Sequence, residues 1–270
     1  GVQTCALPIL KAIQTTLAKD KENNDMSLYD WYAKALSDNK QILQRITNVL
    51  VADSAFSKKP FIDNMLGIGF NVVSRLRHDA ALYYLWEGDP TGKPGRPRVK
   101  GEKIDFKNID KSKVAILDTD ESNGQVYALK AWCKSLHRKI SLVIHILPKG
   151  GHRLYFSTDE SMSGRDVMEY YCTRFQIEFC FRDAKQFVGL TDSQARDTRK
   201  LDFAFNSSFT AVNVAKIMCS EYNLSIWRLK ALIINAYYAQ RIIDVFENNP
   251  NTQLNHEIVN EIFGFAADAA

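Results

Sequence analysis

Four polar residues of the segment 166–190 have the spacing of one helix face and the chemistry of a metal or phosphate site. Tyr171, Arg174, Glu178 and Lys185 lie at offsets 0, 3, 7 and 14, within about 60° of one another on a helix. A carboxylate is a ligand for a hard divalent cation, and a guanidinium one turn before it can receive a phosphate. The pattern therefore indicates a helix that presents both groups on one side.

A second stripe of the same segment is apolar and lies roughly a quarter turn away, so we expect it to face the core. It consists of Ile177, Phe181, Ala184 and Val188. A simpler interpretation of the polar row stays open, because Arg174 and Glu178 are four residues apart and an ordinary surface ion pair has the same spacing.

The string Tyr171-x2-Arg174-x3-Glu178-x6-Lys185, whose last three residues lie in RFQIEFCFRDAK, resembles the Tyr-Arg-Glu-Lys signature of DDE transposases of bacterial insertion sequences, the insertion-sequence-four group. All spacings of the signature are kept, and the resemblance covers roughly residues 10–238. It implies that Glu178 is the last of three carboxylates that bind two divalent metal ions. It also implies that Arg174 and Lys185 hold DNA phosphates, and that Tyr171 stacks on or hydrogen-bonds a flanking nucleotide.

A second acid, Asp53, follows the β-branched apolar run 46–52, ITNVLVA, which is typical of a strand covered on both faces. Sheets of α/β proteins bind ligands at the carboxyl ends of such strands, although an aspartate there is also a common helix cap. The segment 51–80 resembles the part of the family around its second catalytic aspartate, which implies that role for Asp53. Asp63 and Asp79 are competing candidates, and neither ends a buried strand.

The elements around these acids follow from periodicity and caps. We predict a helix over 28–43 capped by Ser27, a strand over 46–52, a helix over 58–66 and a strand over 70–76. Four β-rich runs then predict a small antiparallel insertion. They are 114–117, 126–132, 140–147 and 153–156.

The remaining elements are helical. Ser163 and Asp166 form a capping box for the Glu178 helix, and Asp159 before them is interpreted as a turn residue. Two further helices are predicted over 204–222 and 226–247.

A basic stretch, residues 91–103, reads TGKPGRPRVKGEK and predicts an exposed linker. Arg96 and Arg98 lie in its GRPR core, and the family commonly has a similar basic segment here. They are therefore candidates for contact with the DNA backbone or a narrow minor groove. A merely solvated charge run is the alternative.

Composition sets broad limits. The chain has 270 residues, 46% hydrophobic and 24% charged, enough for one large or two small domains. The net charge of +4 is too mild to establish a nucleic-acid partner by itself. Cysteines and histidines lack zinc spacing, and no run of about 18 apolar residues occurs. We expect a reduced, cytoplasmic, nucleoid-associated protein with no membrane contact.

We predict an α/β protein with a ribonuclease-H-like catalytic core that is incomplete at its N-terminus, an inserted antiparallel β subdomain and C-terminal helices. The expected divisions are a non-native leader resembling a translated sequencing adapter (1–9), a partial core with the second catalytic aspartate (10–78), the basic linker and β-rich insertion (79–159), the catalytic glutamate helix (160–190) and a C-terminal helical region (191–270).

The resemblance implies metal-dependent DNA nicking and strand transfer at insertion-sequence ends. Mg²⁺ or Mn²⁺ would be the cofactor, with two ions in the complete protein. The partners would be double-stranded DNA, both ends and target, with a homo-oligomer on DNA left open.

Upstream of Asp53 we expect no counterpart of the family's first aspartate. The candidates there are Asp20, Asp25, Asp30 and Asp38, which lie in predicted loops or a helix. A truncated and nearly inactive chain is therefore expected. The alternatives are a non-enzymatic DNA-binding remnant and a ribonuclease-H-like metal nuclease without strand transfer.

Overall fold

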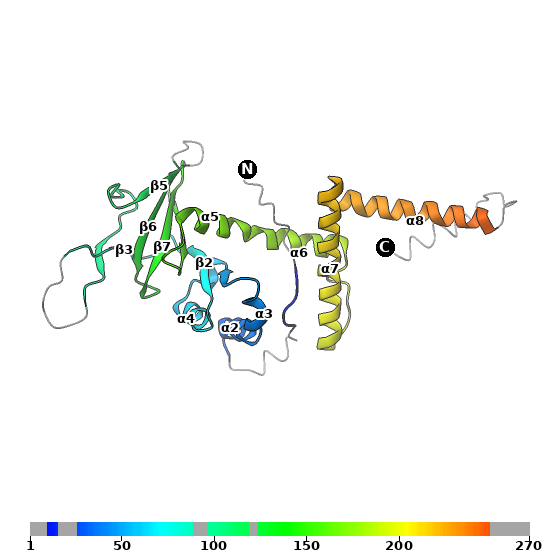
Figure 1. The fold of residues 1–270 in the computed structure, drawn as a ribbon, viewed down its shortest axis with the longest axis horizontal. Coiled ribbons are helices and arrows are strands. Elements are labelled where there is room, and N and C mark those ends of the chain that lie inside the picture. Colours follow the sequence, from blue (N-terminus) through cyan, green and yellow to red (C-terminus); the bar gives the residue numbers. More distant parts are fainter. Residues whose placement is uncertain (1–9, 16–25, 89–96, 119–123, 249–270) are drawn as a thin grey trace. The chain divides into compact units, whose positions relative to one another are not determined.

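The computed structural model describes residues 10–15, 26–88, 97–118 and 124–248 (Figure 1). The chain divides into two compact units. We name them the sheet unit, Thr16–Glu178, and the helical unit, which combines Gly1–Thr15 with Phe179–Ala270. The expected leader, Arg96 and the end of the C-terminal region lie outside the described residues. Among the described helices, none is long and apolar enough to cross a membrane.

The sheet unit is built on one mixed eight-stranded sheet. Its order is β1 (Val49–Val51), β2 (Asn71–Leu76), β8 (His152–Ser157), β7 (Arg138–Ile146), β6 (Gln125–Cys133), β3 (Leu82–Leu85) and β4 (Lys100–Lys103), with β5 (Ala115–Asp118) also paired to β6. β1 and β2 are parallel, and the other pairs are antiparallel.

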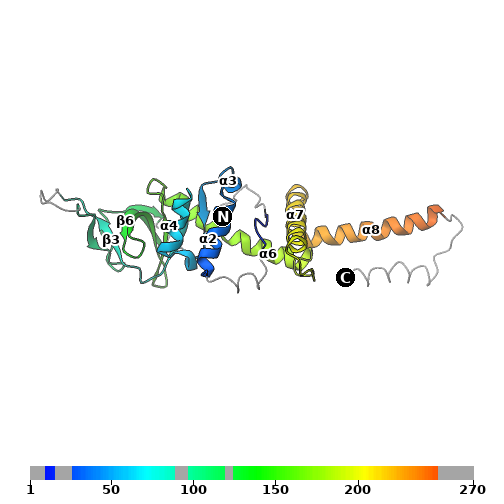
Figure 2. The same cartoon turned by 90° about the horizontal axis from the view of Figure 1, so that it is seen from below.

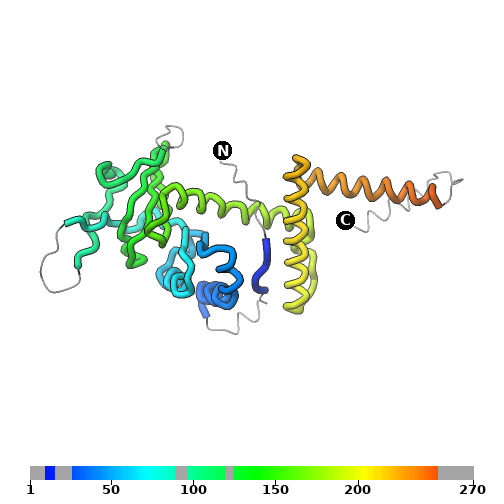
Figure 3. Tube along the Cα trace, in the orientation of Figure 1, coloured from blue at the N-terminus to red at the C-terminus, as the bar shows by residue number. Residues whose placement is uncertain are grey.

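The predicted strand, helix, strand unit is present as β1, α4 (Lys59–Gly67) and β2, and its path can be followed in Figure 3. The predicted β-rich runs also form strands, with one difference from the expectation. They do not make a sheet of their own, because β8 pairs along β2 and so joins them to the sheet that carries β1.

Alternation along the strands builds a core on each face of the sheet. On one face, Val72 and Phe156 pack with helix α4 and with α2 (Leu28–Asp38). On the other face, Val73 and Tyr155 pack with α5 (Gly164–Thr173). Figures 1 and 2 show α2 and α4 beside each other next to the sheet. The two faces explain why the central strands are almost wholly buried.

The helix predicted over 166–190 is interrupted at Arg174. α5 ends at Thr173, and α6 (Phe175–Phe187) begins immediately after it. The N–H of Arg174 donates to the carbonyl of Tyr171, three residues back, which tightens the turn. The predicted cap is confirmed, because Ser163 accepts from the N–H of Asp166 at 3.1 Å. Arg174 therefore lies at a helix junction.

The predicted C-terminal helices are α7 (Thr198–Tyr222) and α8 (Ile226–Asn248). In the helical unit, Ala184 of α6 and Val188, just after the end of α6, join a cluster with Phe209 of α7. Ile177 and Phe181 remain 49% and 40% exposed, so the prediction of a continuous core stripe was wrong there. Phe181 still contacts this cluster at its edge, because the centre of its ring lies 5.6 Å from that of Phe209.

Candidate functional site

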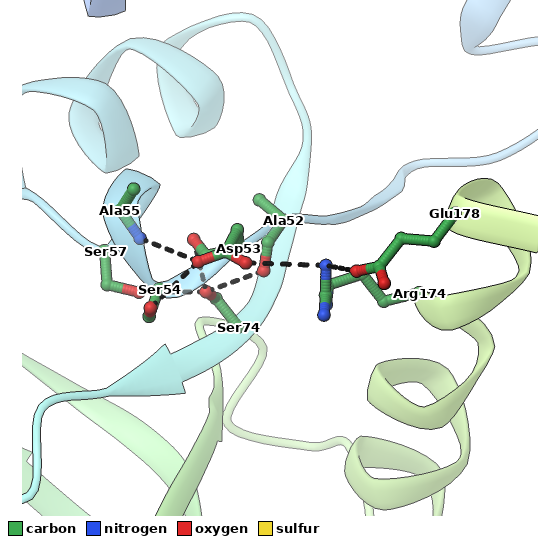
Figure 4. A network of polar contacts seen from close by, with 8 residues as sticks. All are labelled: Ala52, Asp53, Ser54, Ala55, Ser57, Ser74, Arg174 and Glu178. Carbon is green, nitrogen blue, oxygen red and sulfur yellow. Dashed lines mark hydrogen bonds and ion pairs between the residues drawn. The ribbon is translucent and has the colours of Figure 1, made fainter. Parts of the chain in front are cut away.

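Asp53 lies two residues beyond the end of β1 and caps the short 3-10 helix η1 (Ser54–Phe56). Its Oδ1 accepts from the hydroxyl of Ser54 at 2.9 Å and from the N–H of Ala55 at 3.2 Å. The capping interpretation of Asp53 is thus confirmed for one carboxylate oxygen. The other oxygen, Oδ2, is directed toward Arg174 (Figure 4).

Buried hydroxyls hold the backbone around Asp53. Ser74 on β2 is fully buried, and its hydroxyl donates to the carbonyl oxygen of Ala52 at 2.8 Å. Ser57 in turn donates to the Ser74 hydroxyl at 2.9 Å. These contacts join the segment after β1 to its neighbouring strand (Figure 4). The position of the Asp53 carboxylate is therefore fixed by the sheet and by hydrogen bonds on both sides.

Arg174 brings Asp53 and Glu178 together. Its Nη1 lies 3.4 Å from Oδ2 of Asp53 and 2.9 Å from Oε1 of Glu178. The distance between the two carboxylate oxygens therefore cannot exceed the sum of those two distances. The Arg174 side chain is only 17% exposed, and its guanidinium lies over the ring of Phe175 at 4.5 Å. This is more than the ordinary surface ion pair that helical spacing alone allows.

The electrostatics favour an ionised Asp53. Its pKa lies below the ordinary value chiefly because the Ser54 hydroxyl donates to the carboxylate; Arg174 and Arg75 add a smaller attraction, while partial burial opposes the shift. The pKa of Tyr171, by contrast, is raised mainly by burial. The site thus holds an acid in its charged form beside a neutral phenol.

The donor set fits a hard divalent cation. Carboxylate oxygens are the ligands that Mg²⁺ and Mn²⁺ prefer, and a positive group already lies between Asp53 and Glu178. Nε of Arg174 is buried without a hydrogen-bond partner, so this arrangement leaves the guanidinium incompletely satisfied. Within the described ranges, no three His, Cys, Asp or Glu side chains gather as a metal site. The described residues therefore provide two carboxylates, Asp53 and Glu178, as candidate metal ligands at this site.

The other residues of the sequence signature have different surroundings. Tyr171 is only 6% exposed, and its ring packs 4.9 Å from that of Tyr155. It supports the helix junction beside Arg174, whose guanidinium carbon lies 5.8 Å from its ring centre. Lys185 is exposed on α6 within the helical unit. The structure therefore brings together Asp53, Arg174 and Glu178, with Tyr171 behind them.

Of the two basic-linker candidates, only Arg98 is described. Its guanidinium stacks over the ring of Trp86 at 3.9 Å, and its Nε donates to the carbonyl of Lys100 at 3.1 Å. Trp86 remains 37% exposed. The guanidinium of Arg98 is therefore held at the surface by a cation–π contact with a partly exposed indole.

The competing acids have other partners. Asp63 pairs with Lys59 and Arg138. Asp159 accepts from the N–H of Ser161 at 2.8 Å, as a turn residue does, which agrees with its interpretation from sequence. Asp79 lies in an exposed ion pair with Arg77 at 3.1 Å. None of these contacts involves Arg174 or Glu178.

Sequence reasoning missed the hydroxyls that support Asp53. None of Ser54, Ser57 and Ser74 was predicted to support Asp53, and Ser74 lies within a strand whose apolar neighbours dominate its pattern. A hydroxyl directly after a candidate acid was the available signal for Ser54. For Ser74 the signal exists only once β1 and β2 are paired.

Comparison with protein families gives a match. A family model described as the transposase DDE domain matches residues 33–214, which is more than half of the chain. The matched range contains Asp53, Tyr171, Arg174, Glu178 and Lys185. No match was found among curated proteins.

Proposed function

The chain belongs to the transposase DDE domain family, and on that basis we propose that Asp53 and Glu178 are two of its catalytic, metal-binding carboxylates. The proposed activity is DNA nicking followed by strand transfer at the ends of an insertion sequence. The observation that carries it is the meeting of two acids, distant in the sequence, on one guanidinium. An ion pair that only stabilised the fold would need one acid beside Arg174, not two.

Asp53 and Glu178 would hold Mg²⁺ or Mn²⁺, which when bound supplies an activated nucleophile and neutralises the leaving oxygen. Asp53 is prepared for this role because its hydrogen bonds keep it ionised and oriented. Glu178 lies one helical turn after the junction, where its carboxylate contacts the same guanidinium nitrogen as that of Asp53.

Arg174 has two roles in the proposal. In the free protein its guanidinium neutralises the two carboxylates and keeps them near each other. With DNA bound, the same planar fork is suited to two oxygens of a phosphate. The unsatisfied Nε is consistent with a side chain that gains a partner when substrate arrives. Tyr171 is a positioning residue, because it packs behind this arginine.

The remaining assignments rest on family resemblance. Lys185, Arg96 and Arg98 would contact DNA phosphates, and the stacking of Arg98 on Trp86 supports that role. Membership of the insertion-sequence-four group, a ribonuclease-H-like core and assembly as an oligomer on DNA belong to the same proposal. The family pattern uses three carboxylates to bind two metal ions, and the described residues offer only two carboxylates at this site. We therefore expect weak turnover.

Metal binding gives the first test because it does not require turnover. Mn²⁺ binding to the full chain is measured by calorimetry or by paramagnetic resonance, for the wild type and for Asp53→Asn, Glu178→Gln and Asp63→Asn. We expect the first two substitutions to weaken binding at least tenfold. Asp63→Asn is the matched control, because Asp63 is an acid of the same unit with partners elsewhere. Equal binding by all four proteins would refute the assignment.

Nicking of supercoiled plasmid with Mg²⁺ or Mn²⁺ gives the second test. Residual nicking should disappear in Asp53→Asn and Glu178→Gln and persist in Asp63→Asn. Supplying a 3′-hydroxyl end together with a target duplex separates strand transfer from plain nuclease action. DNA binding that ignores the metal in every assay would instead identify a non-enzymatic binding module.

A further inference from the structure

A second feature lies beside Asp53: a cavity of about 310 Å³ whose lining is strongly basic. Its polar lining residues are Ser54, Arg75, Arg77, His78, His152 and Arg153. Ser54 is shared with the site described above, since its hydroxyl donates to Asp53. The cavity is therefore continuous with the surroundings of the catalytic acid.

Strand pairing explains why these residues meet. β1 and β2 are parallel, so the residues that follow both strands reach the same edge of the sheet. β8 runs antiparallel to β2 with Leu76 opposite Leu154, which places Arg77 and Arg153 just beyond the last pair. His152 then contacts the carbonyl oxygen of His78 at 2.8 Å. Residues that are distant in the sequence therefore line one side of the same cavity.

The positive charge of the residues that line the cavity exceeds the negative charge of the acids paired with them. Three arginines line the cavity, and among the ion pairs of the described residues only Arg77 has an acidic partner, Asp79. Arg75 lies on β2 directly after Ser74, whose hydroxyl donates to the carbonyl oxygen of Asp53 at 3.1 Å. A cavity with such a lining attracts an anion, and the guanidinium fork matches phosphate oxygens.

We propose that this cavity binds the backbone phosphate of the DNA strand that flanks the phosphate cut at Asp53 and Glu178. The proposal rests on the proposed function, which supplies DNA as the substrate. The volume is at the lower limit of ligand pockets, about 300 to 1,000 Å³, so it admits one phosphate with its sugar and no duplex. Contacts of this kind fix the register of a strand without reading its sequence.

The first measurement is fluorescence anisotropy of the full chain with a labelled random-sequence duplex, without divalent metal and at several salt concentrations. We expect Arg77→Ala with Arg153→Ala to weaken binding at least tenfold at low salt. The slope of log affinity against log salt should fall by about 0.9, the contribution of one phosphate contact, because the cavity takes one phosphate. Arg77→Lys with Arg153→Lys should keep the slope, because the charges are retained.

Lys40→Ala with Arg45→Ala is the matched control. It also removes two exposed positive charges from the sheet unit, but these lie before β1 and not after it. We expect less than a twofold change in affinity. A control variant that loses as much affinity as the arginine variant would show that total charge matters and the cavity does not.

Histidine resonances give a local measurement on the unmutated protein. On addition of the duplex, the imidazole signals of His78 and His152 should shift, because both line the cavity. His137 lies at the β6–β7 turn and should not shift. Absence of shifts at His78 and His152 while the protein binds DNA would overturn the proposal.

The outcomes separate the two claims. Unchanged DNA binding and salt slope in the arginine variant, with metal-dependent nicking lost in Asp53→Asn, would sink the cavity proposal and leave the proposed function standing. Conversely, weaker DNA binding in the arginine variant, with metal binding unaffected by Asp53→Asn, would retain the anion site and refute the catalytic assignment.

Discussion

The guanidinium of Arg174, at the junction of α5 and α6, lies 3.4 Å from the carboxylate of Asp53 beyond the end of β1. The same nitrogen is 2.9 Å from Glu178. Arg174 thus occupies a position between two acids that the proposed function assigns to a metal ion. A cation and an arginine cannot both be there, so their competition should be measurable.

Arg174→Ala should therefore bind Mn²⁺ more tightly than the wild type when DNA is absent, by about three- to tenfold, in keeping with the modest strength of partly exposed ion pairs. Its affinity for DNA should fall, because the phosphate-binding fork is lost. Calorimetry with Mn²⁺ and anisotropy with a duplex measure the two effects. Arg138→Ala, which removes an arginine paired with Asp63, should change neither. Weaker Mn²⁺ binding in Arg174→Ala would contradict the competition.

Ser54→Ala should raise the pKa of Asp53, because the hydroxyl of Ser54 is the main cause of its lowered value. A lowered pKa in the folded state stabilises the fold above the ordinary aspartate value of about 3.9, and this stabilisation is lost as the pH falls through the folded value. The difference in unfolding free energy between wild type and Ser54→Ala should hence shrink below that pH.

Carboxyl carbon resonances followed through a pH titration would measure the pKa of Asp53, and urea unfolding at two pH values the stability. Ser161→Ala is the control, because Ser161 lowers the pKa of Asp159 in the same way. This substitution should raise the pKa of Asp159 and leave the pKa of Asp53 unchanged. An unaltered Asp53 titration in Ser54→Ala would show that the hydrogen bond has no such effect.

Gly164→Ala should disturb the site through the packing of α5. A Cβ at Gly164 would come within 2.5 Å of the Cβ of Ala128 and 2.8 Å of Leu117 Cδ1, so α5 must move away from the sheet. We expect a stability loss of roughly 1–3 kcal/mol and weaker Mn²⁺ binding, since α5 leads into α6, which carries Glu178. Chemical denaturation and calorimetry test this. At Gly67, on α4, a Cβ meets nothing within 4 Å, so Gly67→Ala should be tolerated.

Arg98→Ala should weaken DNA binding about three- to tenfold and lower the salt slope by about 0.9, irrespective of sequence, as expected for one lost phosphate contact. The stacking on Trp86 holds this guanidinium at the surface. Anisotropy with two unrelated duplexes makes the measurement, with Lys111→Ala as an exposed basic control. A sequence-dependent loss would indicate base contact instead.

Most elements of this fold could be predicted locally. The Ser163 cap depends on residues three positions apart, and the strand character of β1 and β2 depends on β-branched runs. Interactions over a few residues leave their spacing in the sequence, so these elements were correctly placed. The break at Arg174 was not predicted, because the residues on both sides have ordinary helical spacing and conformations.

The sequence by itself determined which side chains could do the chemistry: an acid after a β-branched apolar strand, and an arginine and a glutamate one helical turn apart. Only the tertiary structure decided that Asp53 and Glu178 contact the same guanidinium, that of Arg174, and that a cavity lined by basic residues lies beside Asp53. The physical reason is that strand pairing, which brings β1, β2 and β8 to a common edge, depends on contacts between residues distant along the chain.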